Sequence, residues 1–308
     1  MLEICLKENI LLLDHVIVTA LGLEKKESSL AYAVQKVRGE ELNRVKEVNM
    51  ITALAGKAAG VQVSKNSSGM GGSAKVSIRG VRSVAGDNQP LYVIDGVPML
   101  NSTSEQAYSA IGGTANAGNR DGGDGISNLN PEDVESISIL KGAPAAALYG
   151  SQAANGVILI TTKKGNTVGR RDIHFSTGLT FEKAFSLPEM QNSYGVNDVT
   201  DSWGEKENLT VYDNLGDFFR TGLTSITSVS VNSGNDKLQT YFSYANTTGR
   251  GILNENKLSK HNINLRETAV LFNSRLKLDG NVNVMKQTVK NKPVSGGFYM
   301  NPLVGLYR

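Results

Sequence analysis

Side chains that could support metal or acid–base chemistry are few and scattered in this sequence. Cys5 is the single cysteine, and His15, His174 and His261 lie far apart, without the spacing of a metal-binding motif. No nucleophile stands at a recognisable spacing from a base, and no two carboxylates have a catalytic spacing. We therefore expect a protein that is not an enzyme and that holds neither a metal ion nor a cofactor.

Two glycine-containing segments suggest phosphate or calcium binding at first sight. Residues 66–73 read NSSGMGGS, but Lys75 then leads into a strand-like segment. A phosphate-binding loop needs its Lys-Ser/Thr pair at the head of a helix. Asp121 and Asp124 flank two glycines, yet a calcium loop needs more oxygen ligands at regular spacing and a distal glutamate. The sequence therefore favours neither site.

The predicted secondary structure is clearest in residues 130–165. After an Asn-Pro turn signal, residues 135–140 alternate between apolar and polar side chains, which predicts a half-buried strand. A proline favours the first turn of a short helix at residues 145–149, with Gly150 as its C-terminal cap. Residues 157–162 are almost continuously apolar and β-branched, which predicts a strand covered on both faces.

The N-terminal part is predicted to add two strands and one helix. Residues 32–38 and 61–63 are β-prone, so we expect strands there. Residues 40–59 carry apolar side chains at helical spacing and two glutamates in the first turn, which predicts an amphipathic helix packed on the sheet. The Asp-Gly pair at 95–96 predicts a tight turn, and the charged residues 21–29 predict a tether.

From residue 172 onward, apolar and polar side chains alternate through five predicted strands, at residues 172–182, 224–233, 237–247, 259–267 and 276–284. Such alternation over about ten residues is typical of a transmembrane β-barrel, and a soluble β-sandwich shows the same alternation. The barrel interpretation assigns a lipid-facing set and a lumen-facing set. The first is Phe175, Leu179, Leu278 and Val282; the second is Ser176, Lys277 and Asn281.

Several motifs, occurring in a fixed order, resemble a known family. They are SIRG at 77–80, PLYVIDGVP at 90–98, ESISILKG at 135–142, AALYGS at 146–151 and ANGVILITTKKG at 154–165. These motifs resemble those of the plug domain of TonB-dependent outer-membrane receptors, in the SusC/RagA branch. The resemblance implies an α+β plug domain followed by the first strands of an antiparallel transmembrane β-barrel. The chain would then divide into a leader with a TonB-box-like segment and tether, a plug domain and a partial barrel, at 1–30, 31–168 and 169–308.

The length of the predicted sheet implies an incomplete protein. Five strands cannot close a barrel, because an open edge in lipid leaves costly unpaired backbone groups, and plugged outer-membrane transporters close with about 22 strands. We expect an N-terminal fragment. No apolar run reaches ~18 residues, so we expect no transmembrane helix. Glu3 and Glu8 interrupt the first twelve residues, which predicts a truncated start with a misassigned leader rather than a signal peptide.

The resemblance also implies functional residues. The TonB box, which would bind the periplasmic energy-coupling protein by strand addition, corresponds to an extended, β-branched segment, although an ordinary edge strand would have the same composition. It comprises Leu13, Asp14, His15, Val16, Ile17, Val18, Thr19 and Ala20, with His15 where the family usually has glutamate. Residues 101–128 are predicted to form a long, polar, substrate-facing plug loop. Its candidate contacts are Asn101, Asn119, Asp121 and Asp124.

The implied partners are those of an outer-membrane importer. They are TonB with its ExbB/ExbD energy supply, a SusD-like surface lipoprotein, an oligosaccharide or peptide substrate, and outer-membrane lipid, with the TonB-box side in the periplasm. Nucleic acid is not expected, since the net charge is +3 and the 32 basic residues form no stripe. Two alternatives remain, a signalling receptor of the same architecture and a secreted β-rich binding or hydrolytic protein.

Arg79 and Arg82 could pair with barrel carboxylates or end a solvated strand.

Overall fold

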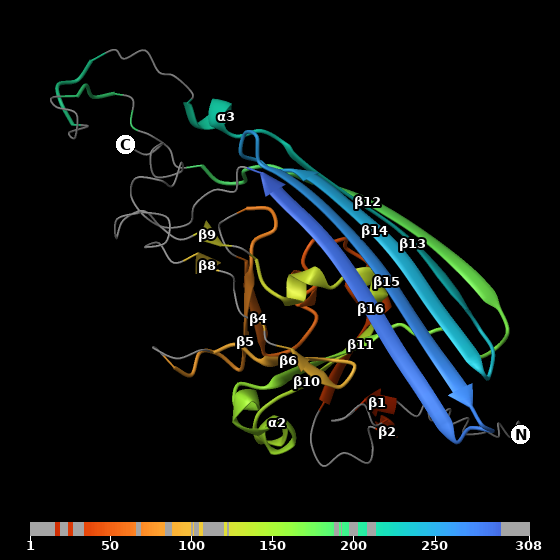
Figure 1. Cartoon of the computed structure of the whole chain (residues 1–308). Coiled ribbons are helices and arrows are strands. Elements are labelled where there is room, and N and C mark those ends of the chain that lie inside the picture. Colours follow the sequence, from red (N-terminus) through yellow and green to blue (C-terminus); the bar gives the residue numbers. More distant parts are fainter. Residues whose placement is uncertain are drawn as a thin grey trace, which may run out of the picture.

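The computed structural model describes residues 16–18, 24–26, 34–65, 69–83, 88–99, 101, 105–106, 120–121, 123–187, 191, 193–196, 203–207 and 214–290. These residues form a mixed N-terminal domain followed by one open antiparallel sheet (Figure 1). The sheet runs along one side of the N-terminal domain, so its strands have one face toward that domain and one face away from it.

A five-stranded sheet forms the centre of the N-terminal domain. Its strands, in spatial order, are β3 (Val34–Arg38), β10 (Val134–Leu140), β11 (Val157–Thr162), β6 (Leu91–Ile94) and β7 (Val97–Met99). β11 pairs with β6 in parallel, and the other pairs are antiparallel. The predicted turn at 95–96 is confirmed: Asp95 and Gly96 have φ angles of 48° and 88°, as the tight turn of a hairpin requires.

The remaining elements outside the two larger sheets are short hairpins and helical turns. The hairpins are β1–β2 (Val16–Val18, Glu24–Lys26), β4–β5 (Val61–Lys65, Ala74–Ile78) and β8–β9 (Glu105–Gln106, Arg120–Asp121). The helices are α1 (Gly39–Leu42), α2 (Ala143–Tyr149), α3 (Asn214–Phe218) and the 3-10 turns η3 (Thr52–Leu54), η5 (Ile126–Asn128), η6 (Pro131–Asp133) and η7 (Gly150–Ala153). Within the described residues, no helix is both long and apolar enough to span a lipid bilayer.

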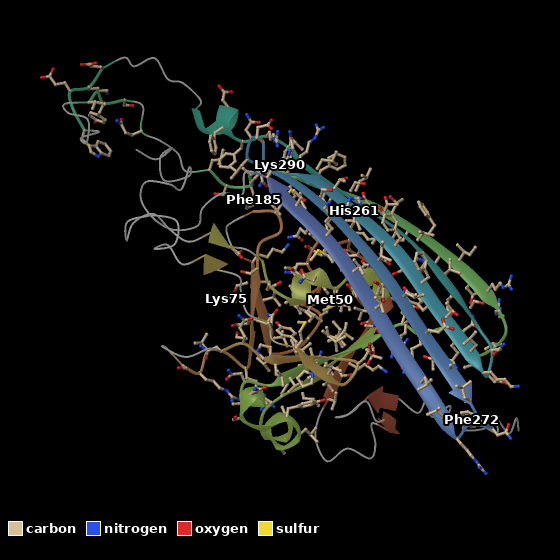
Figure 2. All side chains as sticks on the ribbon, in the orientation of Figure 1. Met50, Lys75, Phe185, His261, Phe272 and Lys290 are labelled. Carbon is tan, nitrogen blue, oxygen red and sulfur yellow. The ribbon has the colours of Figure 1, made fainter. Side chains whose placement is uncertain are left out.

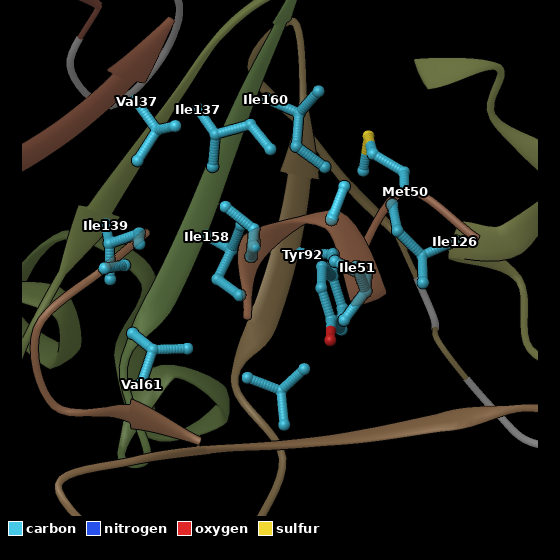
Figure 3. Close-up of a cluster of buried hydrophobic side chains, with 14 of the residues drawn as sticks. Val37, Met50, Ile51, Val61, Tyr92, Ile126, Ile137, Ile139, Ile158 and Ile160 are labelled. Atoms are coloured by element: carbon cyan, nitrogen blue, oxygen red, sulfur yellow. The ribbon is translucent and has the colours of Figure 1, made fainter. Parts of the chain in front are cut away.

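The apolar core of the N-terminal domain lies between its central sheet and the segments that cross it (Figure 3). Ile137 and Ile139 of β10 meet Ile158 and Ile160 of β11, and Tyr92 of β6 is fully buried beside them. Burying a side chain of this size contributes about 1.5–3 kcal/mol. The residues of this core all come from the N-terminal domain.

The second sheet contains the strands β12 (Arg171–Glu182), β13 (Gly222–Gly234), β14 (Leu238–Arg250), β15 (Lys257–Leu271) and β16 (Leu276–Lys290), each paired with the next in sequence. All five predicted strands are confirmed, and they are longer than predicted, at 12 to 15 residues. Short turns at 235–237 and 272–275 join strands at one end, and the long connection 183–221 lies at the other.

The amphipathic helix predicted for residues 40–59 is wrong. The chain forms only α1 and η3 there, with turns between them, and Val45 is 62% exposed rather than packed. The side chain of Asn49 accepts the Ile51 N–H at 3.0 Å, and the Thr52 hydroxyl donates to the Asn49 carbonyl at 2.7 Å. Such local bonds compete with helical hydrogen bonds.

Two smaller predictions also need correction. β10 is covered on both faces rather than half-buried, because Ser136 and Ser138 are 6% and 4% exposed. Residues 21–29 are not only a tether, since Glu24–Lys26 form β2 and pair antiparallel with Val16–Val18. The other predicted elements of 130–165 are confirmed: α2 begins with proline in its first turn and ends at Gly150, and β11 is buried on both faces.

Candidate functional site

The C-terminal sheet presents mainly polar side chains to the N-terminal domain, and its exposed apolar side chains lie on the outward face. Phe175, Leu179, Leu278 and Val282 are each more than half exposed, on the face that the barrel interpretation assigned to lipid. The inward face buries a set of polar side chains, namely Thr224, Ser228, Ser243, Thr247, Lys260, Asn262, Asn264, Arg266 and Thr268. The contact between domain and sheet is therefore a polar interface.

A buried arginine connects the two parts of the chain. Arg266 of β15 donates to Asp95 at 3.0 Å and to the Thr162 hydroxyl at 2.6 Å, both in the N-terminal domain. It also makes two hydrogen bonds to Asp279 of β16, at 2.9 and 2.8 Å. Asp95 is held in place by the Thr162 N–H at 3.0 Å. Planar, bidentate contacts of this kind fix geometry as well as charge.

A buried carboxylate makes a second connection. Asp133, at the end of η6, is fully buried and accepts hydrogen bonds from Tyr241 at 3.0 Å and Ser243 at 2.5 Å, both on β14. Burial raises the pKa of the Asp133 carboxyl, and the hydrogen bonds from Ser243 and Tyr241 oppose this shift. The carboxylate therefore depends on the sheet for the donors that offset its burial.

Two lysines complete the interface. Lys46 of the N-terminal domain pairs with Glu132 and donates to Ser176 of β12. Gly178 leaves room for it, since a Cβ at that position would lie 2.5 Å from the Lys46 Cγ. Lys260 of β15 is 3% exposed and donates to the Ser127 carbonyl at 2.6 Å. Each part of the chain thus contributes a lysine that donates a hydrogen bond to the other part.

The glycine-rich loop at 69–73 is held by carboxylates of the same domain. Asp121 accepts the Ser73 N–H at 2.7 Å and its hydroxyl at 3.1 Å, and Asp124 accepts the Ala74 N–H at 2.9 Å. The backbone N–H groups of Ser73 and Ala74 are therefore not free to bind a phosphate. Beside the loop lies a cavity of about 290 Å³, lined on its other side by residues of the sheet that include Thr224 and Gln287.

Comparison with known proteins identifies a family with this arrangement of domain and sheet. Residues 26–157 match the TonB-dependent Receptor Plug Domain family. The chain is 30% identical over 304 residues to the TonB-dependent receptor SusC of Bacteroides thetaiotaomicron, covering 96% of this chain and 28% of that protein. The RagAB peptide importer in its open-open state has a TM-score of 0.68 at 25% identity, covering 90% of this chain and 32% of that chain. This chain is a SusC/RagA-type TonB-dependent receptor sequence.

A further relative supports the same family. A TonB-dependent receptor of Formosa agariphila is 35% identical over 180 residues, which cover 58% of this chain and 16% of that protein. These relatives are named as receptors and importers rather than as enzymes. The chain spans about a third or less of their length. The resemblance in the sequence is thus confirmed, with the N-terminal domain as the plug and β12–β16 as barrel strands.

The TonB-box prediction falls partly within the described residues. Val16, Ile17 and Val18 form β1, whose pairing with β2 shows that the segment is extended. The remaining five predicted contacts lie outside the described residues, namely Leu13, Asp14, His15, Thr19 and Ala20. The segment is compatible with strand addition, since it already pairs with another strand through its backbone.

Three of the four predicted plug-loop residues are described, and their side chains hydrogen-bond to the backbone of the plug itself. Asn101 accepts the Ile126 N–H at 2.9 Å. Asp121 and Asp124 are each 4% exposed, and their carboxylates hold the glycine-rich loop. Asn119 lies outside the described residues. Any effect of the two aspartates on a ligand would therefore act through the shape of the loop.

Sequence reasoning missed the residues that join plug and sheet. It weighed Arg79 and Arg82 as partners of barrel carboxylates, but Arg82 donates to the Ala154 carbonyl within the plug at 2.9 Å. The charged contact runs the other way, from Arg266 of the sheet to Asp95 of the plug. One signal was available, since Arg266 occupies a polar position of an alternating strand.

Within the described residues, no three His, Cys, Asp or Glu side chains gather to hold a metal ion.

Proposed function

We propose that the protein containing this chain imports a nutrient across the outer membrane, with energy supplied through TonB. The observation that carries the proposal is the plug docked on the polar face of barrel strands, with an extended segment preceding the plug. The relatives named above support transport as the activity, because they include an importer with the same arrangement. No step of covalent chemistry is required.

The lengths of the connections between strands suggest how the sheet is oriented in the membrane. Outer-membrane barrels have short periplasmic turns and longer extracellular loops. The turns at 235–237 and 272–275 are short and the connection 183–221 is long, so the short-turn end would face the periplasm. In Figure 1 the β1–β2 hairpin lies toward that same end. The TonB-contact segment would then be within reach of a periplasmic protein.

Strand addition is the proposed mode of TonB contact. TonB would pair with the backbone of residues 13–20, whose backbone hydrogen bonds provide affinity and whose alternate side chains fix the register. β1 pairs with β2 along one of its edges, so TonB would either use the opposite edge or displace β2. A pull on this segment would be transmitted to the plug, which the Arg266–Asp95 ion pair and several hydrogen bonds hold against the sheet.

The substrate proposal follows from the relatives. The RagAB peptide importer supports a peptide as substrate. An oligosaccharide as the alternative substrate, and a SusD-like surface lipoprotein as partner, are proposed from the SusC/RagA resemblance. Asn101, Asn119, Asp121 and Asp124 are proposed to shape the substrate-facing side of the plug, the aspartates by holding the 69–73 loop. We retain the division into 1–30, 31–168 and 169–308, as leader with TonB segment, plug and partial barrel.

The test is uptake by living cells. Cells that produce the receptor containing this chain are supplied with labelled oligosaccharides or peptides, with and without a functional TonB gene. Accumulation that needs both receptor and TonB, together with co-purification of a surface lipoprotein, supports the proposal. TonB-independent accumulation, or a receptor that is recovered outside the outer membrane, contradicts it.

A further inference from the structure

The outward face of the C-terminal sheet changes character toward the long-loop end. Apolar residues give way to a row of hydroxyl side chains that face one another across four adjacent strands. The strand register places Ser225 opposite Thr248, Thr248 opposite Ser259, and Ser259 opposite Thr288. Hydroxyl groups can donate hydrogen bonds to an anion.

A row of cations lies directly beyond the hydroxyl row. Arg250 stands opposite Lys257, and Lys257 stands opposite Lys290, on β14, β15 and β16. Like charges at directly opposite positions destabilise a sheet unless an anion lies between them. Glu255 pairs with Lys257 at 2.9 Å, whereas Arg250 and Lys290 have no ion pair within the described part of the chain. An excess of positive charge therefore remains on this patch.

The two rows enclose a groove of about 590 Å³ on the outward face. Its lining combines the hydroxyls of Ser225, Thr248, Ser259 and Thr288 with the cationic side chains of Arg250, Lys257 and Lys290. Figure 2 shows Lys290 at the end of the sheet opposite to the Phe272 turn. The groove thus lies at the long-loop end and opens away from the plug.

The slant of the apolar band relates this groove to a membrane. The exposed apolar residues of β12 are centred on Thr177, and those of β16 are centred on Gly280. Register places Thr177 level with Lys286. The centre of the apolar band therefore shifts along the strand direction by about 20 Å between β12 and β16, which lie about 19 Å apart across the sheet. This slope of about 45° matches the strand tilt of membrane barrels. The groove on β14–β16 therefore lies just outside the apolar band.

We propose that this groove binds the phosphorylated headgroup of a lipid in the outer leaflet. The inference rests on the proposed function, because it takes the outward face as membrane-embedded and the long-loop end as extracellular. Arg250 can hold phosphate oxygens in a bidentate manner, and the two lysines supply point charges. The hydroxyl row can donate to the remaining oxygens.

The test compares two triple variants of the receptor that contains this chain. In the first, Arg250→Gln, Lys257→Gln and Lys290→Gln remove the cationic row. In the second, Arg171→Gln, Lys237→Gln and Arg275→Gln remove the same charge at the short-turn end. Each purified receptor is titrated with phosphatidylcholine vesicles, either plain or containing diphosphoryl lipid A or its fully dephosphorylated form. Inorganic phosphate serves as a soluble competitor.

We expect the first variant to bind the diphosphoryl vesicles more weakly by on the order of tenfold to a hundredfold, since each basic residue near an anionic surface adds to affinity. The second variant should bind like the parent, and the dephosphorylated vesicles should not distinguish the proteins. Equal weakening in both variants, or equal binding to both lipids, would overturn the inference. Failure of the parent receptor to assemble in outer membranes would instead contradict the proposed function itself.

Discussion

Arg266 of β15 and Asp95 of the β6–β7 turn form an ion pair of 3.0 Å across the boundary between plug and barrel strands. The two residues are 171 positions apart in sequence. Arg266 is 4% exposed and also binds Asp279 and Thr162. The plug is therefore positioned by a charged contact that has little access to water.

Replacing Arg266 should loosen the plug. Arg266→Met leaves Asp95 and Asp279 without their guanidinium partner. The cost should stay below the roughly 3–5 kcal/mol of a fully buried pair, because the Asp279 side chain is 30% exposed. Arg275→Met, in an exposed turn, serves as control and should change stability by less than about 0.5 kcal/mol. Thermal unfolding in detergent and protease access to the plug measure the effect. Similar behaviour of the two variants would show that the pair does not hold the plug.

A small substitution at Gly178 should disturb the Lys46 contact. The Cβ of Gly178→Ala would lie 2.5 Å from the Lys46 Cγ, so the lysine must move away from Glu132 and Ser176. Such overpacking costs about 1–3 kcal/mol. Gly280→Ala is the matched control in the same sheet, because nothing lies within 4 Å of its Cβ. A loss of stability in both variants, or in neither, would count against the assigned packing.

The Asp133 carboxyl predicts a pH dependence. Burial raises its pKa in the folded protein above that of an exposed aspartate. Between the unfolded and folded pKa the folded state holds more protons, so stability falls as pH rises through this window. Asp133→Asn removes this contribution, and its stability relative to the parent should improve as pH rises. Unfolding temperatures of both proteins across the acidic range provide the test, and a constant difference would contradict the prediction.

The two faces of β16 should differ in their tolerance of charge. Val282→Arg places a charge on the apolar outward face and should cost about 2–4 kcal/mol at mid-membrane depth. Asn283→Arg, on the neighbouring inward position, should cost much less. The measurement is the amount of receptor assembled in outer membranes. Equal assembly of the two variants would mean that the outward face does not meet lipid.

The barrel strands could be predicted from sequence because their signal is local. Ile173, Phe175 and Leu179 recur at every second or fourth position, and the same period fixes both the strand and its outward face. The Asp95-Gly96 turn was equally local. In contrast, Val45 and Val48 suggested a helical face, but bonds around Asn49 produced turns instead. Local periodicity fails where a short polar side chain captures the backbone.

The plug–sheet contacts could not be predicted from sequence. Asp133 and Ser243 are 110 positions apart, and nothing near Asp133 indicates that its partners lie on a later strand. The same holds for Lys260 and the Ser127 carbonyl. These pairs depend on how the finished plug docks against the finished sheet. The motifs identified the family, but the contacts needed the three-dimensional structure.

The central claim is tested most directly by substrate uptake in cells that produce the receptor with Val18→Pro. Proline removes a backbone donor and fixes φ, so it should abolish strand addition to TonB. Lys25→Pro is the control, because it disrupts the β1–β2 pairing from the other strand and leaves the TonB segment intact. We predict that Val18→Pro abolishes uptake while surface binding persists, and that Lys25→Pro retains uptake. Normal uptake with Val18→Pro would contradict the account.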